Sequence, residues 1–267
     1  MINYEIYRHK EESNKTDIIN YMIYSHTDFL DLLNIQYDHI SGRGHLTLCI
    51  NNNNLDLDSI YEKFDNVVFY NDGETYGQKL LSCINQVDYN YILFIHDNDI
   101  LFDADDSKIL EFLHFLKVND YDRVDFQLAY DFNSTHRDTI LDDGLYLIKS
   151  SNTDTRAQGY IYNVNPSIWK RETLQKILEK FSHLDYRTIE QDAVQVFASQ
   201  FNIFKLFSKQ NYRCGYFTCL EPFKYLHITR SRQLFSPKTL APEECKDIID
   251  VYNTIVDKYN LKESQRW

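Results

Sequence analysis

The feature that most constrains the fold is an apolar run, Tyr91 to Ile95, that is followed at once by His96-Asp97-Asn98-Asp99. The run is aromatic and β-branched and does not alternate with polar residues, which is typical of a parallel strand covered on both faces by helices. Ligands of α/β proteins bind beyond the carboxyl ends of such strands. The sequence therefore predicts an α/β fold with the carboxylates of Asp97 and Asp99 at a binding edge.

Strand and helix patterns alternate through the first half of the chain, with turn residues between them. In chain order they predict a strand from Ile18 to Ser25, a helix from Asp28 to His39, a strand from His45 to Ile50, a helix from Leu57 to Phe64, a strand from Asn66 to Tyr70, a helix from Gly77 to Gln86, the strand from Tyr91 to Ile95 and a helix from Ser107 to Lys117. Such alternation implies parallel pairing with right-handed crossovers. We therefore expect an open, doubly wound, mostly parallel sheet flanked by helices.

The second half is less regular. Its patterns predict strands from Arg123 to Tyr130, Leu145 to Lys149 and Tyr160 to Val164, helices near Lys170 to Phe181 and Thr188 to Phe201, a strand near Ile203 to Phe207, and loops up to Arg232. The segment from Pro242 to Tyr259 has apolar residues at helical spacing and predicts an amphipathic helix. Such a helix either packs on the core or joins two chains as a homodimer, and the sequence leaves both open.

At 267 residues the chain is long enough for one α/β domain with a substantial core. We expect a peripheral segment at 1–16, a domain at 17–232 whose halves meet at residue 118, and a helical appendage at 233–267.

Composition excludes several classes of function. A net charge of −12 disfavours nucleic acid and anionic membranes as partners. The five cysteines include no C-x-x-C pair, which argues against a disulfide framework or a structural zinc site. No apolar stretch is long enough to span a membrane, and the first residues lack a signal-peptide pattern. We therefore expect a soluble, cytoplasmic protein.

Asp97 and Asp99 flank a single residue, so both can reach one hard divalent cation. Alternatively, one of them binds the cation and the other acts through water or sugar hydroxyls. Acidic residues after a strand are also common turn formers. The pair by itself therefore leaves a plain turn open.

Taken in order, four segments resemble those of GT-A-fold glycosyltransferases, most closely the family 2 type. The segments are Tyr21-Met-Ile-Tyr-Ser-His26, Asn66-Val-Val-Phe-Tyr-Asn-Asp72, Lys79-Leu-Leu-Ser-Cys-Ile-Asn-Gln86 and the run from Tyr91 to Asp99. The resemblance covers roughly residues 17 to 232. It implies a Rossmann-like GT-A fold, a nucleotide-diphosphate sugar as donor, with a UDP-sugar favoured, and Mn²⁺ or Mg²⁺ as cofactor. A cation suits this chemistry because an acidic protein needs one to bind a diphosphate.

The resemblance also implies roles for individual residues. Asp99 is the expected direct metal ligand, Asp97 a second ligand or the residue facing ribose or sugar, and His227 the third ligand, from a late loop. The residues expected to contact the nucleotide or the sugar are Tyr24, Ser25, His26, Asn51, Asp72, Lys79, Asp97, Trp169 and Arg230, with Arg232 as a second choice for the diphosphate. Packing roles remain open for His227, Lys79, Trp169 and the strand end at Tyr24 to His26.

An inverting transfer needs a general base that takes the proton of the acceptor hydroxyl. The resemblance places this base at Glu190-Gln191-Asp192, which departs from the Glu-Asp pair of the family by the inserted Gln191. Thr188 and Gln191 have capping-box spacing and predict that a helix begins there. We expect Asp192 to be the base and Glu190 to be the alternative, although carboxylates also favour the positive end of a helix without any catalysis.

These observations predict a metal-dependent glycosyltransferase that moves a sugar from a UDP-sugar to the hydroxyl of a glycan or other acceptor. Two alternatives remain. A sugar nucleotidyltransferase would carry a glycine-rich phosphate loop after the first strand, and Tyr24-Ser-His-Thr-Asp-Phe29 has no glycine. A non-catalytic carbohydrate-binding or assembly protein would share the fold without the chemistry.

Overall fold

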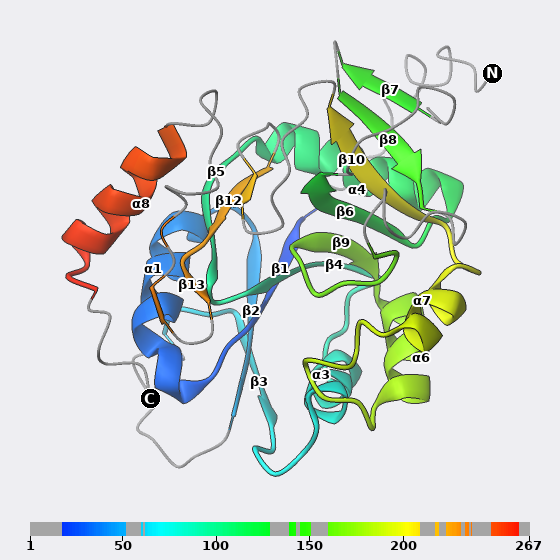
Figure 1. Cartoon of the computed structure of the whole chain (residues 1–267), viewed down its shortest axis with the longest axis horizontal. Helices are drawn as coiled ribbons and strands as arrows, with labels where there is room; N and C mark the ends of the chain where they lie inside the picture. Colours follow the sequence, from blue (N-terminus) through cyan, green and yellow to red (C-terminus); the bar gives the residue numbers. More distant parts are fainter. Residues whose placement is uncertain are drawn as a thin grey trace.

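The computed structural model describes residues 18–51, 60, 62–128, 139–142, 145–150, 160–208, 217–218, 223–230, 233–234, 236 and 247–261. The predicted peripheral segment 1–16 and half of the helix predicted from Leu57 to Phe64 lie outside these residues. Figure 1 shows a large twisted sheet with helices on both faces and a smaller sheet beside it.

The large sheet has nine described strands and is mostly parallel, as predicted. Their order is β3 (Asn66–Tyr70), β2 (His45–Asn51), β1 (Asn20–Tyr24), β4 (Tyr91–His96), β9 (Ser167–Lys170), β6 (Arg123–Leu128), β10 (Ile203–Ser208), β8 (Leu145–Lys149) and β7 (Thr139–Asp142). β3, β2, β1 and β4 pair in parallel, and so do β6 and β10. β9 and β8 run against their neighbours.

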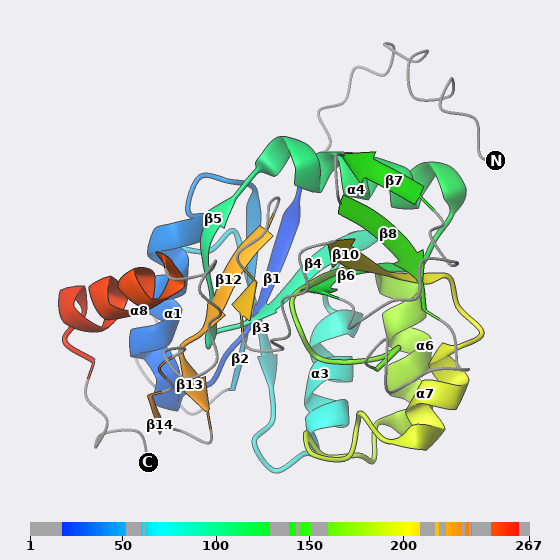
Figure 2. The ribbon, with the colours of Figure 1, turned by 45° about the horizontal axis from the view of Figure 1, so that its top comes forward.

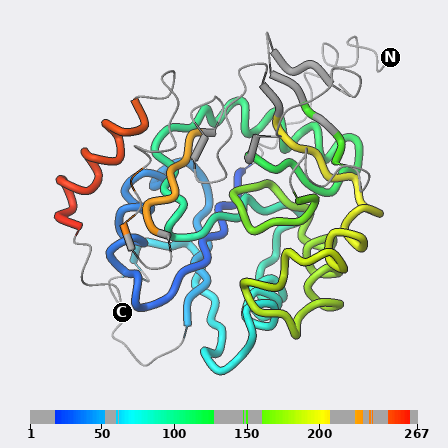
Figure 3. Tube along the Cα trace, in the orientation of Figure 1, coloured from blue at the N-terminus to red at the C-terminus, as the bar shows by residue number. Residues whose placement is uncertain are grey.

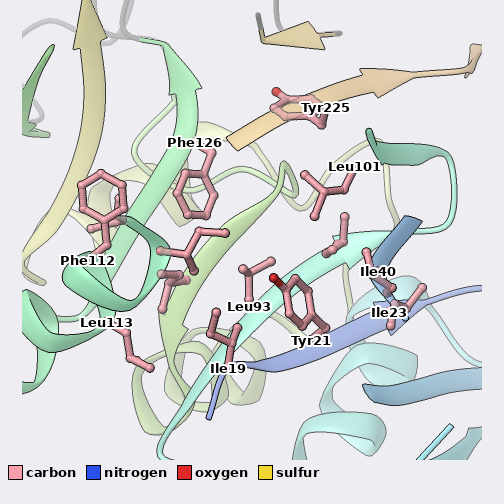
Figure 4. Close-up of a cluster of buried hydrophobic side chains, with 14 of the residues drawn as sticks. Ile19, Tyr21, Ile23, Ile40, Leu93, Leu101, Phe112, Leu113, Phe126 and Tyr225 are labelled. Carbon is pink, nitrogen blue, oxygen red and sulfur yellow. The ribbon is translucent and has the colours of Figure 1, made fainter. Parts of the chain in front are cut away.

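Apolar residues cover both faces of the sheet because successive residues of each buried strand point to opposite sides. On β1, Tyr21 and Ile23 join one core, which includes side chains of α1 (Leu30–Ile40) and α4 (Asp106–Asn119). Met22 joins the other, under α3 (Tyr76–Asn85), α6 (Arg171–Phe181) and α7 (Asp192–Ala198). Figure 4 shows the first core, where Tyr21 and Leu93 of the sheet lie near Leu101, and Figure 2 shows the helices on either side.

The smaller sheet positions residues next to the end of β4. It consists of β11 (Phe217–Thr218), β12 (Phe223–His227) and β5 (Asp99–Ala104), all antiparallel. β5 starts just after the Asp97-Asn98 turn and runs beside α1 (Figure 3). In its pairing with β12, Asp99 lies opposite His227. A further two-stranded pair joins β13 (Thr229–Arg230) to β14 (Gln233–Leu234).

The last helix, α8 (Asp247–Lys258), packs on its own chain. Its buried residues Ile248, Tyr252 and Ile255 form one apolar cluster with side chains of α1, β5 and β12. α8 and α1 lie side by side in Figures 1 and 2. Of the two arrangements that the sequence left open, core packing is confirmed, and the apolar face that would have joined two chains is covered.

Three sequence predictions are wrong. Residues 160–164 form no strand, because the Gln195 side chain bonds both the amide and the carbonyl of Tyr162, each at 2.9 Å. The helix predicted from Thr188 begins at Asp192, because the Thr188 hydroxyl bonds the backbone of Asp185 instead of capping a helix. The stretch up to Arg232, predicted as loops, contains β11, β12 and β13.

Within the described part of the chain, no helix is both long enough and apolar enough to cross a membrane.

The packing of α8 gives a prediction about stability. Replacing Ile248, which is fully buried, by Ala should lower the free energy of unfolding by about 2–5 kcal/mol, because it leaves a cavity between α8 and α1. The exposed Asn253→Ala on the same helix is the control and should change stability little. Chemical denaturation measures both. If the loss for Ile248→Ala depended on protein concentration, the helix would be packing between chains instead.

Candidate functional site

The carboxyl ends of four parallel strands meet at one edge of the large sheet. The ladder continues one residue past the strands: the Ser25 amide donates to the Cys49 carbonyl at 2.9 Å, and the Asp97 amide donates to the Tyr24 carbonyl at 3.0 Å. Asn51 is the last residue of β2, and Asp72 follows β3 by two residues. Polar side chains that are far apart in the sequence therefore converge here, as expected for a sheet of this kind.

Asp72 is the centre of one hydrogen-bonded group at this edge. Its Oδ2 accepts from Nδ2 of Asn51 at 2.8 Å, and its Oδ1 lies 3.1 Å from Nε2 of His26 and 4.0 Å from Nζ of Lys79. Because Nδ1 of His26 accepts from the Asp28 amide, its Nε2 carries the proton and donates to Asp72. The structure thus brings together four of the residues that the sequence predicted for nucleotide contact.

Lys79 reaches Asp72 because α3 begins close to the strand ends. Thr75 and Gln78 form a capping box that starts the helix at Tyr76, which puts Lys79 in the first turn. Its ammonium group also lies 5.5 Å from the centre of the Tyr70 ring. The partly buried Lys79 is therefore held between a carboxylate and an aromatic face, at the edge of an open hollow.

This hollow, which we call the aromatic hollow, has a volume of about 520 Å³. Its lining includes Tyr24, Tyr76, Lys79, Tyr186 and Arg187. Behind it, Tyr24 stacks on Tyr70 with ring centres 5.0 Å apart and meets Tyr76 edge-on at 5.4 Å. Tyr76 in turn meets the half-exposed Tyr186 edge-on at 5.2 Å. Packed rings of this kind form a rigid wall suited to a flat ligand.

Asp97 lies at the inner side of the strand edge and is buried. Oγ of Ser25 donates to its Oδ2 at 2.7 Å. Burial raises the pKa of the Asp97 carboxyl to about 7, although the hydrogen bonds from Ser25 and from the backbone favour the charged form. A positive charge placed beside Asp97 would favour the ionised carboxylate.

Asp99 and His227 form a pair across β5 and β12. Nδ1 of His227 lies 2.7 Å from Oδ1 of Asp99, and Nε2 of the same ring lies 3.2 Å from Nδ2 of Asn98. Because Nε2 accepts from the Asn98 amide, Nδ1 carries the proton and donates to Asp99. Metal-binding histidines are oriented by carboxylates in this manner.

His96, the first residue of the His-Asp-Asn-Asp turn, has a different environment. It is buried, and burial lowers the pKa of its imidazole to about 4. Its Nε2 lies 2.8 Å from the Tyr76 hydroxyl, and the two groups share a hydrogen bond. His96 therefore connects the acidic turn to the wall of the aromatic hollow without adding a positive charge.

The turn around Asn98 provides a partial set of ligands for a hard cation. Oδ1 of Asn98 is buried and has no hydrogen-bond partner among the described residues. It lies in the same turn as Asp97 and Asp99, and such oxygens are what Mg²⁺ and Mn²⁺ prefer. However, among the residues that the structure describes, no group of three or more His, Cys, Asp or Glu side chains could hold a metal ion. The residues fit a cation only if further ligand atoms come from a bound molecule.

A second hollow adjoins the aromatic hollow at Arg187, which lines both. We call it the carboxylate hollow, because Glu190 and Asp192 lie in its wall with Tyr160. Oε1 of Glu190 accepts from the Val164 amide at 2.9 Å, and burial raises the pKa of this carboxyl. Asp192, in contrast, is exposed at the first residue of α7.

Two other residues, Trp169 and Arg230, were predicted to contact the sugar or the diphosphate. Trp169 was expected to face a sugar, but it is only 1% exposed and packs in the core with Arg123 4.4 Å above its ring, so that prediction is wrong. Arg230 lies in β13, but the placement of its side chain and the whole of Arg232 lie outside the described residues.

Of the tyrosines that line the aromatic hollow, Tyr24 was predicted from the sequence, whereas Tyr76 and Tyr186 were not, and neither was Tyr70, which stacks on Tyr24. Tyr70 ends a strand, Tyr76 starts a helix, and Tyr186 with Arg187 precedes the acidic pair. Their position next to predicted ligand-binding residues was the only signal in the sequence that would have pointed to them.

No protein-family model matches the sequence, and no curated protein matches it. Several solved structures are similar to the chain. Among them are S. aureus TarS 1–349, at 11% identity over 93% of this chain and 68% of that one, with a TM-score of 0.43; UDP-glucose pyrophosphorylase complexed with UDP-glucose, at 14% identity over 72% and 91%, with a TM-score of 0.46; and HddC from Yersinia pseudotuberculosis, at 12% identity over 72% and 91%, with a TM-score of 0.44. These neighbours have Rossmann-like α/β folds. Because the three TM-scores are below 0.5, we infer the activity of the chain from its own residues.

Proposed function

We propose that this chain is a metal-dependent glycosyltransferase that takes a sugar from a nucleotide-diphosphate sugar, with a UDP-sugar favoured, and transfers it to an acceptor hydroxyl. One observation carries the proposal. The turn that holds Asp97 and the Asp99–His227 pair lies at the same strand edge as the aromatic hollow with Lys79. Cation ligands, a cationic side chain and a flat aromatic wall thus lie next to one another, as a nucleoside diphosphate requires.

The aromatic hollow is the proposed site of the nucleoside. Its volume of about 520 Å³ falls within the range of small-molecule sites. The rings of Tyr24 and Tyr186 offer stacking surfaces for a base, and polar atoms of Asp72 and Lys79 lie at its rim. His26, just beyond the end of β1, completes the set of proposed nucleoside contacts. Ser25 was predicted as a contact too, but it is only 1% exposed, and its hydroxyl is bonded to Asp97.

The cation is proposed to bind at the turn, held by Asp99 and the Asn98 side-chain oxygen, with Asp97 close by. His227, which the sequence predicted as a third ligand, is proposed to orient Asp99, because its Nδ1 donates to Asp99 and its Nε2 accepts from Asn98. Mg²⁺ and similar ions are commonly held by one or two carboxylates together with substrate phosphates. The diphosphate would supply the ligand oxygens that the described residues lack. A bound cation neutralises the charge that develops on the departing diphosphate.

The general base is proposed to be Glu190, in place of the Asp192 favoured by the sequence. A base must be held in a fixed orientation, and its pKa should lie near the working pH. Glu190 is anchored through Oε1 to the Val164 amide, and burial raises its pKa. Its hollow shares Arg187 with the aromatic hollow, so an acceptor bound there would lie next to the proposed donor. With Glu190 as the base for that acceptor, we propose inversion.

The cation site gives the first prediction. UDP should bind with Mn²⁺ present and bind much more weakly after chelation. Asp99→Asn should weaken Mn²⁺-dependent UDP binding by about 10- to 100-fold, because it alters a ligand and the partner of His227. Isothermal titration measures both effects. Asp103→Asn is the matched control: it removes the same charge from β5 at a position that pairs with Lys224, and binding should be unchanged. Equal affinity with and without the metal would exclude the proposed cation site.

The base gives the second prediction. Glu190→Gln should slow sugar transfer on the order of a hundredfold or more, with UDP-sugar affinity nearly unchanged, because a base acts mainly in the transition state. Asp192→Asn should have a much smaller effect.

The assay follows products from a panel of nucleotide sugars by mass spectrometry. Release of the nucleoside diphosphate with transfer to an acceptor or to water supports the glycosyltransferase. Formation of a nucleoside triphosphate from added pyrophosphate would instead identify a nucleotidyltransferase. If Asp192→Asn were the more damaging variant, the base would be Asp192.

A further inference from the structure

A wholly buried ion cluster lies behind the carboxylate hollow. Arg123 and Asp125 are two apart on β6 and share one side of the strand, and Lys205 lies opposite Asp125 on β10. Their exposed fractions are 0%, 0% and 1%. Nζ of Lys205 lies 3.1 Å from Oδ2 of Asp125, and an Nη atom of Arg123 lies 3.6 Å from the same oxygen.

Within the cluster, the positive charges of Arg123 and Lys205 outnumber the single negative charge of Asp125. Two cations face one carboxylate, and buried charges are costly unless they are paired. Nε of Arg123 also has no hydrogen-bond acceptor among the described residues. A second carboxylate interacts with both cations, and it is that of Glu190. With Glu190 ionised, two positive and two negative charges balance.

Arg123 also fixes the segment that contacts Glu190. Its Nη atoms donate to the carbonyls of Ile161 and Asn163 at 3.1 and 3.2 Å and to Oδ1 of Asn163 at 2.6 Å. Nδ2 of Asn163 in turn donates to Asp125 at 2.6 Å. The next residue, Val164, presents its amide to Oε1 of Glu190. The ion cluster is therefore linked to Glu190 in two ways: by hydrogen bonds through the segment 161–164, and by the electrostatic interaction of its charges with the Glu190 carboxylate.

We infer that Arg123 and Lys205 are positioning residues for the proposed base: Arg123 fixes the segment that binds Glu190, and Lys205 supplies positive charge that favours the ionised form of Glu190. This inference rests on the proposed function of Glu190. Among the described residues, the charged and titratable groups that interact with Glu190 or share its hollow are Arg123, Asp125, Lys205, Tyr162, Tyr76, Tyr160, Arg187 and Asp192. Of these, Lys205 and Asp125 are oppositely charged neighbours whose effects on Glu190 have opposite signs.

The opposite signs allow a direct test. Lys205→Gln removes a positive charge and should raise the pKa of Glu190 by about one pH unit, whereas Asp125→Asn removes a negative charge and should lower it. Carbon-13 NMR titration of the glutamate carboxyls, assigned with Glu190→Gln, reads this pKa in the full chain and needs no enzymatic activity. Lys149→Gln on the adjacent β8 is the control, because it removes an exposed lysine, and it should leave the pKa unchanged.

A purely structural cluster gives a different result. Both variants would then shift the pKa of Glu190 in the same direction or leave it unchanged, and either result would overturn the inference. Asp125→Asn is nearly isosteric and keeps a side-chain oxygen for Asn163, so it tests the sign even if Lys205→Gln does not fold.

Activity separates this inference from the proposed function. In an active enzyme, the acid limb of the transfer rate should move to higher pH in Lys205→Gln and to lower pH in Asp125→Asn, with UDP affinity unchanged. A pKa that responds as expected in a protein without transferase activity would keep the charge coupling and refute the proposed function. Transferase activity in a protein whose Glu190 pKa does not respond to either variant would support the proposed function and refute the charge coupling.

Discussion

The candidate site depends on the parallel pairing of β1 with β2 and β4. This pairing sets Tyr24 opposite both Cys49 and His96, so the residues that follow each strand emerge at one edge. A shift of one residue in either ladder would turn every side chain of the strand to the other face. The apolar faces of β1 prevent such a shift, because Tyr21, Met22 and Ile23 are all fully buried and belong to two different cores.

The edge that results has two regions of different charge. At the end of β4, carboxylates of Asp97 and Asp99 are buried close to a side-chain oxygen of Asn98 that has no partner among the described residues. Farther along the sheet, Arg123 and Lys205 bring excess positive charge behind Glu190. A cation with a diphosphate would complete the first region. In the second, Glu190, when ionised, would balance the two cations together with Asp125. Both regions therefore have a defined electrostatic partner.

Much of the fold could be predicted from the sequence where apolar runs are uninterrupted. β3 and β8 have the bounds that the sequence predicted, and β4 differs by one residue. β5 was missed because it follows directly on an acidic turn, which the sequence presents as the end of a strand. Residues 160–164 are apolar enough to resemble a strand, but Gln195 satisfies their backbone from another element. Hydrogen bonds between elements that are far apart in the chain leave no pattern in the local amino-acid sequence.

The site was predictable to a similar degree. The proximity of Asp72 to Asn51, His26 and Lys79 follows from strand ends that meet at one edge, which the alternation of elements implies. The pairing of His227 with Asp99 was expected only through the family resemblance, since it depends on the register of β12 with β5. The cluster of Asp125 with Lys205 had no sequence signal, because β6 and β10 meet only in the folded sheet.

The central claim is that the turn at Asp97 to Asp99 binds a cation that holds a nucleoside diphosphate over the aromatic hollow. Anomalous diffraction from Mn²⁺ in crystals grown with UDP tests it most directly. We expect a manganese peak in contact with Asp99 and the diphosphate, with the uracil ring against Tyr24 or Tyr186. A manganese ion bound elsewhere, or UDP bound away from this edge with no metal, would contradict it.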